Sequence, residues 1–431
     1  MWIYERYDWM NFKWDKDRIS ALTEQVSAQI GFLHGRLSSL AEDDRSGASA
    51  EILTQDIVSS FGIEGIELNT DDVRSSVVRR LGVYNIQTEG TSTHFMEGVV
   101  DMMLDATGNY DVPIDRERLF GWHSALFPTG WNGSYSITVG DYRKSDVQVV
   151  SGSMGREKVH FIAPPPGDVN DLMEEFLYWF NHSSDMSSII RSAISHLVFV
   201  SIHPFDDGNG RIGRAIADMA LAGIDGGRGR YFSMSREIEK EKKEYYAILE
   251  RTQRFSSEGD ITPWLEWYVG CLGRAVDDSL ETLSGILNKP VFWREFSNER
   301  LSDRQRKVLN IFLDGKEAKI TAKNWSRLAG VSLDTAIRDI ADLVGKSILS
   351  PLPGKARKIE YAIQYVRADD FLKLFGEIRI EESEKGHFLT AMFKGERIRE
   401  RISELDHQLY EKGNISSTDL IRKYMAYLSA E

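Results

Sequence analysis

This chain of 431 residues has a single cysteine, no excess of positive charge and no long apolar runs. Its single cysteine, Cys271, excludes an internal disulfide and suits a reducing compartment. No uninterrupted apolar stretch approaches the ~20 residues that a membrane-spanning helix needs, so we expect no membrane partner. Residues 1–30 lack a basic region followed by an apolar run, which is the mark of a secretory signal peptide. These absences together predict a cytoplasmic protein.

Acidic residues outnumber basic ones, with 66 Asp and Glu against 53 Lys and Arg, and the formal net charge is −13. Such a balance excludes a protein that coats nucleic acid or an anionic membrane along its whole length, although it allows a local basic surface. The hydrophobic content of 42% and the charged content of 28% are ordinary for a globular protein. The length allows about three domains.

Chemically active residues are concentrated at positions 203–214, where the sequence reads HPFDDGNGRIGR. The apolar residues of 189–200 repeat at helical spacing, and Pro204 makes helical geometry unfavourable at His203. A helical pattern resumes beyond the glycines. We therefore predict a helix, a loop and a second helix that starts near Gly210.

Four side chains of this stretch point to phosphate chemistry. His203 is a candidate general base, because an imidazole has an ordinary pKa of roughly 6.5. Arg211 and Arg214 are three residues apart at the start of a helix, so they share a face and can clamp a polyphosphate. The helix N-terminus adds free backbone N–H groups. Asp207 would oppose an anion there unless it held a cation such as Mg²⁺.

The stretch fills every defined position of the pattern H-P-F-x-[D/E]-G-N-G-R-x-x-R, and in this it resembles the Fic family. The whole chain is similar to a bacterial Fic subgroup with an aromatic-rich N-terminal segment and a winged-helix module. The resemblance implies a mainly α fold: a Fic-type helical bundle with a small β-hairpin flap, plus a C-terminal winged-helix (α+β) module. It implies a protein adenylyltransferase that moves AMP from ATP to a Ser, Thr or Tyr hydroxyl of a protein, with Mg²⁺ or Mn²⁺.

The resemblance also assigns roles to residues. His203 would be catalytic, Asp207 would hold the metal, and the backbone of 208–210 with the Asn209 side chain would cradle the α-phosphate. Tyr245 and Gln253 would wall the adenine pocket, although the family more often has asparagine at the second position. The expected ATP-binding residues are Asp207, Gly208, Asn209, Gly210, Arg211, Ile212, Gly213, Arg214, Lys158, Val159, His160, Phe161, Tyr245 and Gln253.

A second motif, SFGIEG, begins at Ser60. Ser60 and Glu64 are four residues apart, so on a helix they share a face, and Gly65 can end that helix in the left-handed conformation. The motif resembles the inhibitory pattern [S/T]-x-x-x-E-[G/N] of Fic proteins. The resemblance implies that Glu64 pairs with Arg214 and occupies the room of the ATP γ-phosphate. Gly62 weakens helix propensity by about 1 kcal/mol relative to alanine, which predicts a loose turn.

A strand pair is predicted within 135–163, where apolar residues alternate and a triple proline follows. It resembles the Fic flap, a hairpin that aligns the target segment by main-chain pairing, and we expect 158–161 beside the catalytic loop. Aromatic residues are dense in 1–16, and we expect them to pack on the body of the protein.

The segment 301–366 reads as three helices followed by strand, turn and strand, which resembles a winged helix. It carries 12 Lys and Arg against 7 Asp and Glu, a net charge of +5, and this polarity supports DNA binding. Acidic residues in the predicted recognition helix, Asp334, Asp339 and Asp342, are equally compatible with a protein partner.

The expected organisation is an N-terminal helical segment with the inhibitory motif at 1–110, a Fic catalytic core at 111–275, a helical connector at 276–300, the winged-helix module at 301–366 and a C-terminal helical tail at 367–431. The tail is expected to be helical because Ile398, Ile402, Leu405 and Leu409 have helical spacing. The expected partners are ATP and a protein target, which could be the chain itself, with DNA and a second copy of the chain as further options. Two alternatives stay open for function: removal of AMP from the same target by the same site, and a DNA-binding regulator whose Fic domain senses nucleotide.

Overall fold

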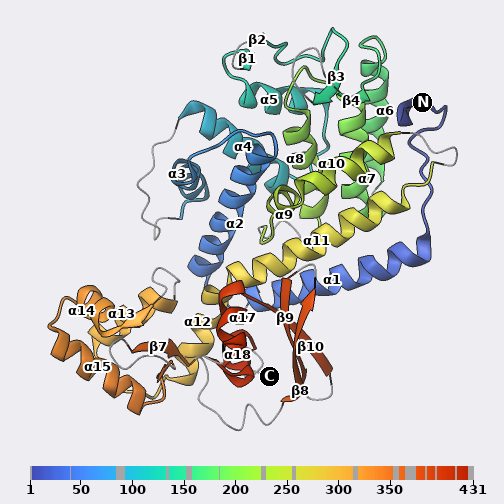
Figure 1. Cartoon of the computed structure of the whole chain (residues 1–431). Helices are drawn as coiled ribbons and strands as arrows, with labels where there is room; N and C mark the ends of the chain where they lie inside the picture. Colours follow the sequence, from blue (N-terminus) through green and yellow to red (C-terminus); the bar gives the residue numbers. More distant parts are fainter. Residues whose placement is uncertain are drawn as a thin grey trace. The chain divides into compact units, whose positions relative to one another are not determined.

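The computed structural model describes residues 2–38, 40–83, 93–132, 135–151, 158–183, 185–224, 230–254, 259–313, 319–352, 359–364, 375–383, 386–393, 396–412 and 415–425 (Figure 1). The fold is mainly helical, as predicted, with small antiparallel sheets. The chain forms two compact units, one of residues 1–35 and 41–276 and the other of 36–40 and 277–431. Within the described ranges, none of the helices combines the length and apolar character needed to cross a membrane.

The N-terminal part of the first unit is helical, and its helices start and stop at residues that suit those positions. Asn69 caps one helix by accepting hydrogen bonds from the backbone N–H groups of Asp71 and Asp72, and Gly82 ends it with a φ of 68°. Thr93 caps the next helix in the same way. The elements are the 3₁₀ helix η1 (Ile3–Glu5), α1 (Lys16–Ser38), α2 (Glu42–Ile63), α3 (Thr70–Leu81) and α4 (His94–Gly108).

The rest of the first unit is a helical bundle built around one apolar helix. Almost every residue of α7 (Ser188–Ile202) is buried, as expected for a helix that is apolar on all sides. Helix α8 (Asn209–Ala222) packs on it at Gly213, where an added Cβ would lie 3.0 Å from Val200 Cγ1. The remaining helices are α5 (Arg116–Leu126), α6 (Val169–His182), α9 (Met234–Lys240), α10 (Lys242–Gln253) and α11 (Thr262–Thr282).

Two short hairpins accompany this bundle. In one, β1 (Trp131–Asn132) pairs with β2 (Tyr135–Ser136). In the other, β3 (Gln148–Ser151) pairs antiparallel with β4 (Lys158–Ile162), and this is the strand pair predicted as a flap. The N-terminal aromatic residues pack on β4 as expected, since the rings of Trp2 and Tyr4 meet Phe161 edge-on with centroids 5.1 and 6.1 Å away.

The second unit contains α12 (Ser284–Glu295) and the elements predicted for 301–366, in the predicted order. They are α13 (Asp303–Leu313), β5 (Ile320–Thr321), α14 (Ala322–Ala329), α15 (Leu333–Gly345), β6 (Leu349–Pro351) and β7 (Glu360–Ile363). The three strands form one sheet in the order β5–β7–β6. Trp325, Phe312 and Leu343 lie in the core that joins helices to sheet. The predicted basic turn with Lys355, Arg357 and Lys358 lies outside the described residues.

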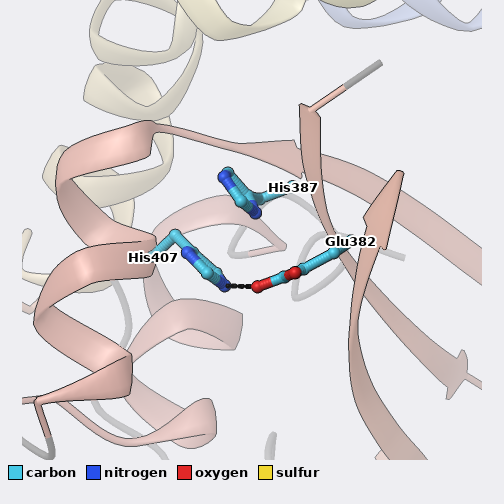
Figure 2. A group of neighbouring side chains, drawn as sticks. All are labelled: Glu382, His387 and His407. Atoms are coloured by element: carbon cyan, nitrogen blue, oxygen red, sulfur yellow. Dashed lines mark ion pairs between the residues drawn. The ribbon is translucent and has the colours of Figure 1, made fainter. Parts of the chain in front are cut away.

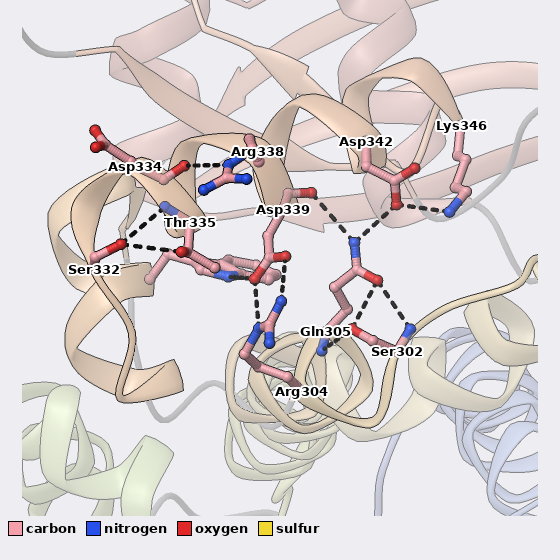
Figure 3. A network of polar contacts seen from close by, with 11 residues as sticks. Ser302, Arg304, Gln305, Ser332, Asp334, Thr335, Arg338, Asp339, Asp342 and Lys346 are labelled. Carbon is pink, nitrogen blue, oxygen red and sulfur yellow. Dashed lines mark hydrogen bonds and ion pairs between the residues drawn. The ribbon is translucent and has the colours of Figure 1, made fainter.

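Polar side chains hold α13 against α15 (Figure 3). Arg304 donates two hydrogen bonds to the carboxylate of Asp339, at 2.8 and 2.7 Å, and Gln305 donates to Asp342 at 2.8 Å. Ser332 caps α15 by accepting from the backbone N–H of Thr335, as the sequence predicts. Charged residues of the predicted recognition helix therefore serve the packing of the module itself.

The prediction of a helical tail at 367–431 is wrong for residues 375–383, 386–393 and 396–402. They form an antiparallel sheet in the order β10–β9–β8, made of β8 (Phe375–Ser383), β9 (Gly386–Phe393) and β10 (Glu396–Ile402). Among the described residues beyond 402, helices form at α17 (Glu404–Glu411) and α18 (Ser417–Tyr424). The spacing of four between Ile398 and Ile402 misled the prediction, because residues i and i+4 share a face of a strand as well as of a helix.

Candidate active site

The catalytic loop begins where α7 ends, at His203. This residue has a left-handed backbone, with φ 54° and ψ 57°, which is strained for a residue with a side chain. Its ring Nδ1 lies 3.2 Å from the carbonyl oxygen of Val200. Because a carbonyl can only accept, Nδ1 carries the proton and Nε2 keeps its lone pair. The tautomer therefore leaves Nε2 available as a base.

Burial lowers the pKa of His203 to about 4, against the opposing effect of the hydrogen bond to Val200. The imidazole is thus neutral at pH 7. A neutral ring is the form that can accept a proton from a hydroxyl group.

Asn209 closes the loop by bonding within it. Its Oδ1 accepts from the backbone N–H of Phe205 at 2.9 Å, and its Nδ2 donates to the Phe205 carbonyl at 2.8 Å. The Asn209 side chain is 2% exposed, and its amide shapes the loop. These bonds use only one of the two N–H groups of Nδ2, so the contact with the α-phosphate that the resemblance implies stays a prediction. Gly208 has a φ of 83°, and a Cβ there would lie 2.9 Å from Phe127. Glycine is required at that position.

Arg143 is a structural residue of the loop that the sequence analysis missed. Its Nε donates to the carbonyl oxygen of His203 at 2.7 Å, and its other nitrogens donate to the carbonyls of Ser145 at 2.9 Å and Pro164 at 2.5 Å. The side chain is 2% exposed. Arg143 therefore ties the catalytic loop to the segments that flank the flap, and no local pattern in the sequence marks it.

Asp207 presents a carboxylate at the mouth of the loop, with its side chain 27% exposed. The side-chain amide of Asn132 donates to it, and Arg211 Nη2 lies 3.3 Å away. The hydroxyl of Tyr135 lies 3.4 Å from the same carboxylate. The contacts from the β1–β2 hairpin were not predicted. One accessible carboxylate suits Mg²⁺, which usually takes its remaining ligands from water and substrate phosphates.

The two arginines are buried and keep unused donors. The guanidinium of Arg211 lies 5.0 Å from the ring centroids of both Phe61 and Phe127, and its Nε has no partner among the described residues. Arg214 Nη1 is likewise buried and unpartnered within that part of the chain. Buried donors without partners are costly, and a phosphate would satisfy them.

The ion pair between Glu64 and Arg214 that the resemblance implies is present. Arg214 Nη2 donates to Glu64 Oε1 at 3.0 Å, and the same side chain donates to Ser60 Oγ at 2.9 Å and to the Ser60 carbonyl at 2.7 Å. Burial would raise the pKa of Glu64, but Arg214 and Arg211 hold it below its ordinary value. Glu64 Oε1 also lies so close to Gly210 that a Cβ there would overlap it.

Residues of α9 and α10 contact the end of α2 around Gly62. A Cβ at Gly62 would overlap the carboxylate of Glu239. Lys242 Nζ lies 3.4 Å from the Gly62 carbonyl, and the Tyr246 hydroxyl lies 3.4 Å from the Ile63 carbonyl. The helix then stops at Gly65, whose φ of 78° is the left-handed conformation predicted for it.

Tyr245 and Gln253, the predicted adenine contacts, are side chains of the bundle interior. Tyr245 is 2% exposed, and its hydroxyl lies 2.9 Å from Nε2 of the buried His196. Gln253 is 4% exposed and donates to Ser201 Oγ at 3.1 Å. Their role in binding adenine stays a prediction.

The predicted flap contacts lie on β4. His160 Nδ1 is 2.6 Å from the carboxylate of Glu250 on α10, and Lys158 Nζ is 3.5 Å from it. Val159 is half-buried, whereas Phe161 is buried under the N-terminal aromatic residues. Ile212 and Gly213 face α7 in the core, so only their backbone can meet a ligand.

Comparison with known proteins identifies two regions. Residues 113–221 match the Fic/DOC family, and residues 2–83 match a domain of unknown function, DUF4172. The chain is 25% identical to the proteins named "Protein adenylyltransferase Fic" of Drosophila virilis and of Drosophila melanogaster over 265 residues. That stretch covers 61% of this chain and 49% of each relative, so the chain spans about half the length of these curated relatives.

Similar solved structures include a Fic family protein from Desulfovibrio desulfuricans G20, at 20% identity, covering 79% of this chain and 95% of that one with a TM-score of 0.46. Another is a Fic domain containing signaling protein from Bacteroides thetaiotaomicron VPI-5482, at 19% identity, covering 58% and 95% with a TM-score of 0.45. The match to the family ends within α8 and includes the loop that begins at His203. It shows that residues 113–221 are a domain of the Fic/DOC family.

Proposed function

We propose that this protein transfers AMP from ATP to a Ser, Thr or Tyr hydroxyl of a protein, and that Glu64 inhibits the transfer. The observation that carries the proposal is the convergence of a neutral imidazole, an accessible carboxylate and two buried guanidinium groups on the first turn of α8. The similarity to proteins named adenylyltransferases supports AMP as the transferred group.

In the proposed reaction, His203 Nε2 takes the proton from the target hydroxyl. The hydroxyl oxygen forms a bond to the α-phosphorus of ATP, the bond from that phosphorus to the bridging oxygen breaks, and pyrophosphate leaves with the electron pair. Backbone N–H groups at the start of α8 face the α-phosphate, where donors aimed at developing charge are most effective. Arg211 and Arg214 hold the β- and γ-phosphates.

Asp207 is the residue that would hold a divalent cation, Mg²⁺ or Mn²⁺, and the bound cation would supply neutralisation of negative charge on the leaving group. Asn132 and Arg211 orient the carboxylate from two sides. This support keeps the Asp207 side chain in one position.

Inhibition follows from competition for a single guanidinium. Glu64 pairs with the guanidinium group of Arg214, to which the γ-phosphate would also bind. The carboxylate and the phosphate therefore compete directly for the same N–H donors. ATP can still enter with Glu64 in place, but its terminal phosphate is then displaced from the productive position.

Transfer can be tested with ATP labelled at either end. Full-length protein, wild type and Glu64→Gly, is incubated with Mg²⁺ and with α-labelled or γ-labelled ATP, and its intact mass is measured. Label from the α-position alone and a mass increase of one AMP support the proposal. Label from the γ-position would instead make the protein a phosphotransferase, and competition by other nucleotides would identify a different transferred nucleotide.

The reverse reaction uses the same residues, because Glu64 could orient a water molecule for hydrolysis of an AMP-modified protein. Incubation of a pre-labelled target without pyrophosphate distinguishes the two directions by release of AMP.

The alternative of a DNA-binding regulator gains little support from the predicted winged-helix module. Three of its basic residues pair within the module: Arg304 with Asp339, Lys346 with Asp342 and Lys319 with Glu360. The exposed face of α15 carries Leu333 and Ile337, which are 52% and 50% exposed. Exposed apolar side chains on a recognition helix suit a protein partner better than a phosphate backbone.

A further inference from the structure

A group of metal-binding side chains lies in the second unit, in the region where the sequence analysis expected only a helical tail. Figure 2 shows Glu382 near the end of β8, His387 near the start of β9 and His407 on α17. Glu382 and His387 are direct partners in the antiparallel register. One ligand atom from each of the three residues lies within 4.8 Å of the others. Three separate elements therefore contribute to one cluster.

His387 is already in the protonation state that a metal ligand needs. Its Nε2 lies 2.8 Å from the carboxylate of Glu404. Because a carboxylate accepts, Nε2 carries the proton and Nδ1 keeps the lone pair. Nδ1 is buried and has no partner among the described residues. A histidine whose one nitrogen donates to a carboxylate while the other offers a lone pair is the usual arrangement of a metal-bound imidazole.

His407 is held beside it on a rigid support. The ring is 6% exposed and stacks on His387 with centroids 3.6 Å apart and planes 10° apart. Its neighbour Asp406 accepts hydrogen bonds from Ser403 at 2.7 Å and from Lys423 at 2.6 Å, which fixes α17. The Nε2 of His407 lies 3.1 Å from the Glu382 carboxylate.

Packing alone does not account for this arrangement. Two stacked rings, each paired with a carboxylate, would hold the hairpin on the helix without any ligand. That arrangement leaves the buried Nδ1 of His387 unsatisfied, which costs free energy unless something binds it. An ion that accepts this lone pair removes the cost.

We propose that Glu382, His387 and His407 bind a zinc ion, with Glu404 orienting His387. Two imidazoles and one carboxylate suit Zn²⁺, whereas Mg²⁺ and Ca²⁺ prefer oxygen ligands alone. Ligand atoms of a tetrahedral zinc ion are about 3.3 Å apart, so the cluster must close somewhat on binding. An ion lies in the plane of each imidazole that binds it, so the parallel rings of His387 and His407 cannot share one ion as they stand, and His387, whose side chain is 22% exposed, must turn out of the stack. Glu382 can follow this movement because its side chain is 67% exposed. The ion would join the β8–β9 hairpin to α17, and a water molecule would take the fourth position.

The test is zinc binding by the full-length protein after treatment with a chelator and without nucleotide. Isothermal titration calorimetry with ZnCl₂ is expected to give one ion per chain, and zinc is expected to raise the melting temperature. His387→Gln and Glu382→Gln are expected to abolish both effects. These two side chains are partly exposed, so their replacement should leave the fold intact, which circular dichroism checks. Glu404→Gln, which removes only the orienting carboxylate, is expected to weaken binding by about 10- to 100-fold.

Two control variants separate this site from other zinc-binding groups. His94→Gln removes a fully exposed histidine at the start of α4, and Asp207→Asn removes the carboxylate proposed for the active-site metal. Both are expected to bind zinc as the wild type does. Zinc binding that survives in His387→Gln, or that is lost in Asp207→Asn instead, would overturn the proposal, and so would the absence of a stoichiometric ion in the wild type.

Discussion

Replacement of Glu64 by glycine tests whether the Glu64 carboxylate alone accounts for the proposed inhibition. The wild-type carboxylate accepts one hydrogen bond from Arg214 at 3.0 Å. The guanidinium keeps two other contacts, to the Ser60 hydroxyl and carbonyl, so it stays in position when Glu64 is removed. The variant therefore frees the donor for the γ-phosphate without dismantling the arginine's support.

The size of the effect follows from the bond that is lost. A hydrogen bond between charged groups contributes about 1.5–3 kcal/mol, and each 1.4 kcal/mol is roughly a factor of ten, so self-modification should rise roughly 10- to 100-fold. The Glu64 side chain is 30% exposed and partly screened by water, which favours the lower half of that range. The free energy of unfolding should fall by about 1–3 kcal/mol, because one donor of a buried arginine loses its partner.

Intact-mass spectrometry over a time course with ATP and Mg²⁺ gives the initial rate of AMP addition for each variant. Glu67→Gly is the matched control, since it removes an exposed carboxylate three residues away and should leave the rate unchanged. Glu64→Gln keeps the shape but not the charge and should give an intermediate rate. Equal rates for wild type and Glu64→Gly would refute the inhibitory role, and a rise in Glu67→Gly as well would show a nonspecific charge effect.

The remaining predictions concern the transfer step, all measured in the Glu64→Gly background. His203→Ala should lower the rate by about 10²- to 10⁴-fold while the melting temperature stays close to that of the parent, and an unchanged rate would remove its role as base. When kcat/KM is measured against pH, its fall on the acid side should be centred nearer pH 4 than 6.5, because the lowered pKa keeps His203 neutral as the pH falls. A fall centred at about pH 6.5 would contradict the argument that burial lowers this pKa. Asp207→Asn should lose the dependence of rate on Mg²⁺ concentration together with most of the activity, whereas full metal-dependent activity would exclude it as the ligand.

The sequence predicts the loop well because its constraints are local. Pro204 disfavours helical geometry at His203, so α7 ends at Ile202, and the glycines around Asn209 permit the turn into α8. The pairing of Glu64 with Arg214, 150 residues apart, was predictable only through the resemblance of both motifs to one family. No periodicity connects two such distant positions.

Contacts that depend on tertiary packing were missed or placed differently. Arg143 donates to the nearby carbonyl of Ser145 and to the distant carbonyls of Pro164 and His203, and nothing in the local sequence indicates the two distant contacts. Asn209 bonds to Phe205 through both of its polar atoms, a structural role that the sequence does not indicate, and its contact with the α-phosphate stays a prediction. The burial of Tyr245 likewise follows from how α10 packs on α7, which the local sequence does not specify.

The C-terminal error has a different cause. Apolar residues spaced by four fit a helix and a strand equally, and only the run of alternating residues can separate the two. In β9 burial does not alternate, because Phe388 and Thr390 are buried together with Leu389, Ala391 and Phe393, so this strand shows no period of two that could have corrected the prediction. The three strands then bring Glu382 and His387 together, so the zinc proposal could not have been reached from the helical interpretation.

The packing of α2 bears on how the proposed inhibition by Glu64 would be relieved. Phe61 and Ile63, in the last turn of α2 before Glu64, are both 1% exposed. Asp56 on the same helix accepts a hydrogen bond from Ser233 at 2.6 Å. Withdrawing the helix would expose large apolar side chains, at roughly 1.5–3 kcal/mol for each one, and break buried polar contacts as well. Rotating Glu64 alone breaks one ion pair at a site that is already partly open to solvent. The lower-energy route to an active state therefore keeps α2 in place and moves only the carboxylate.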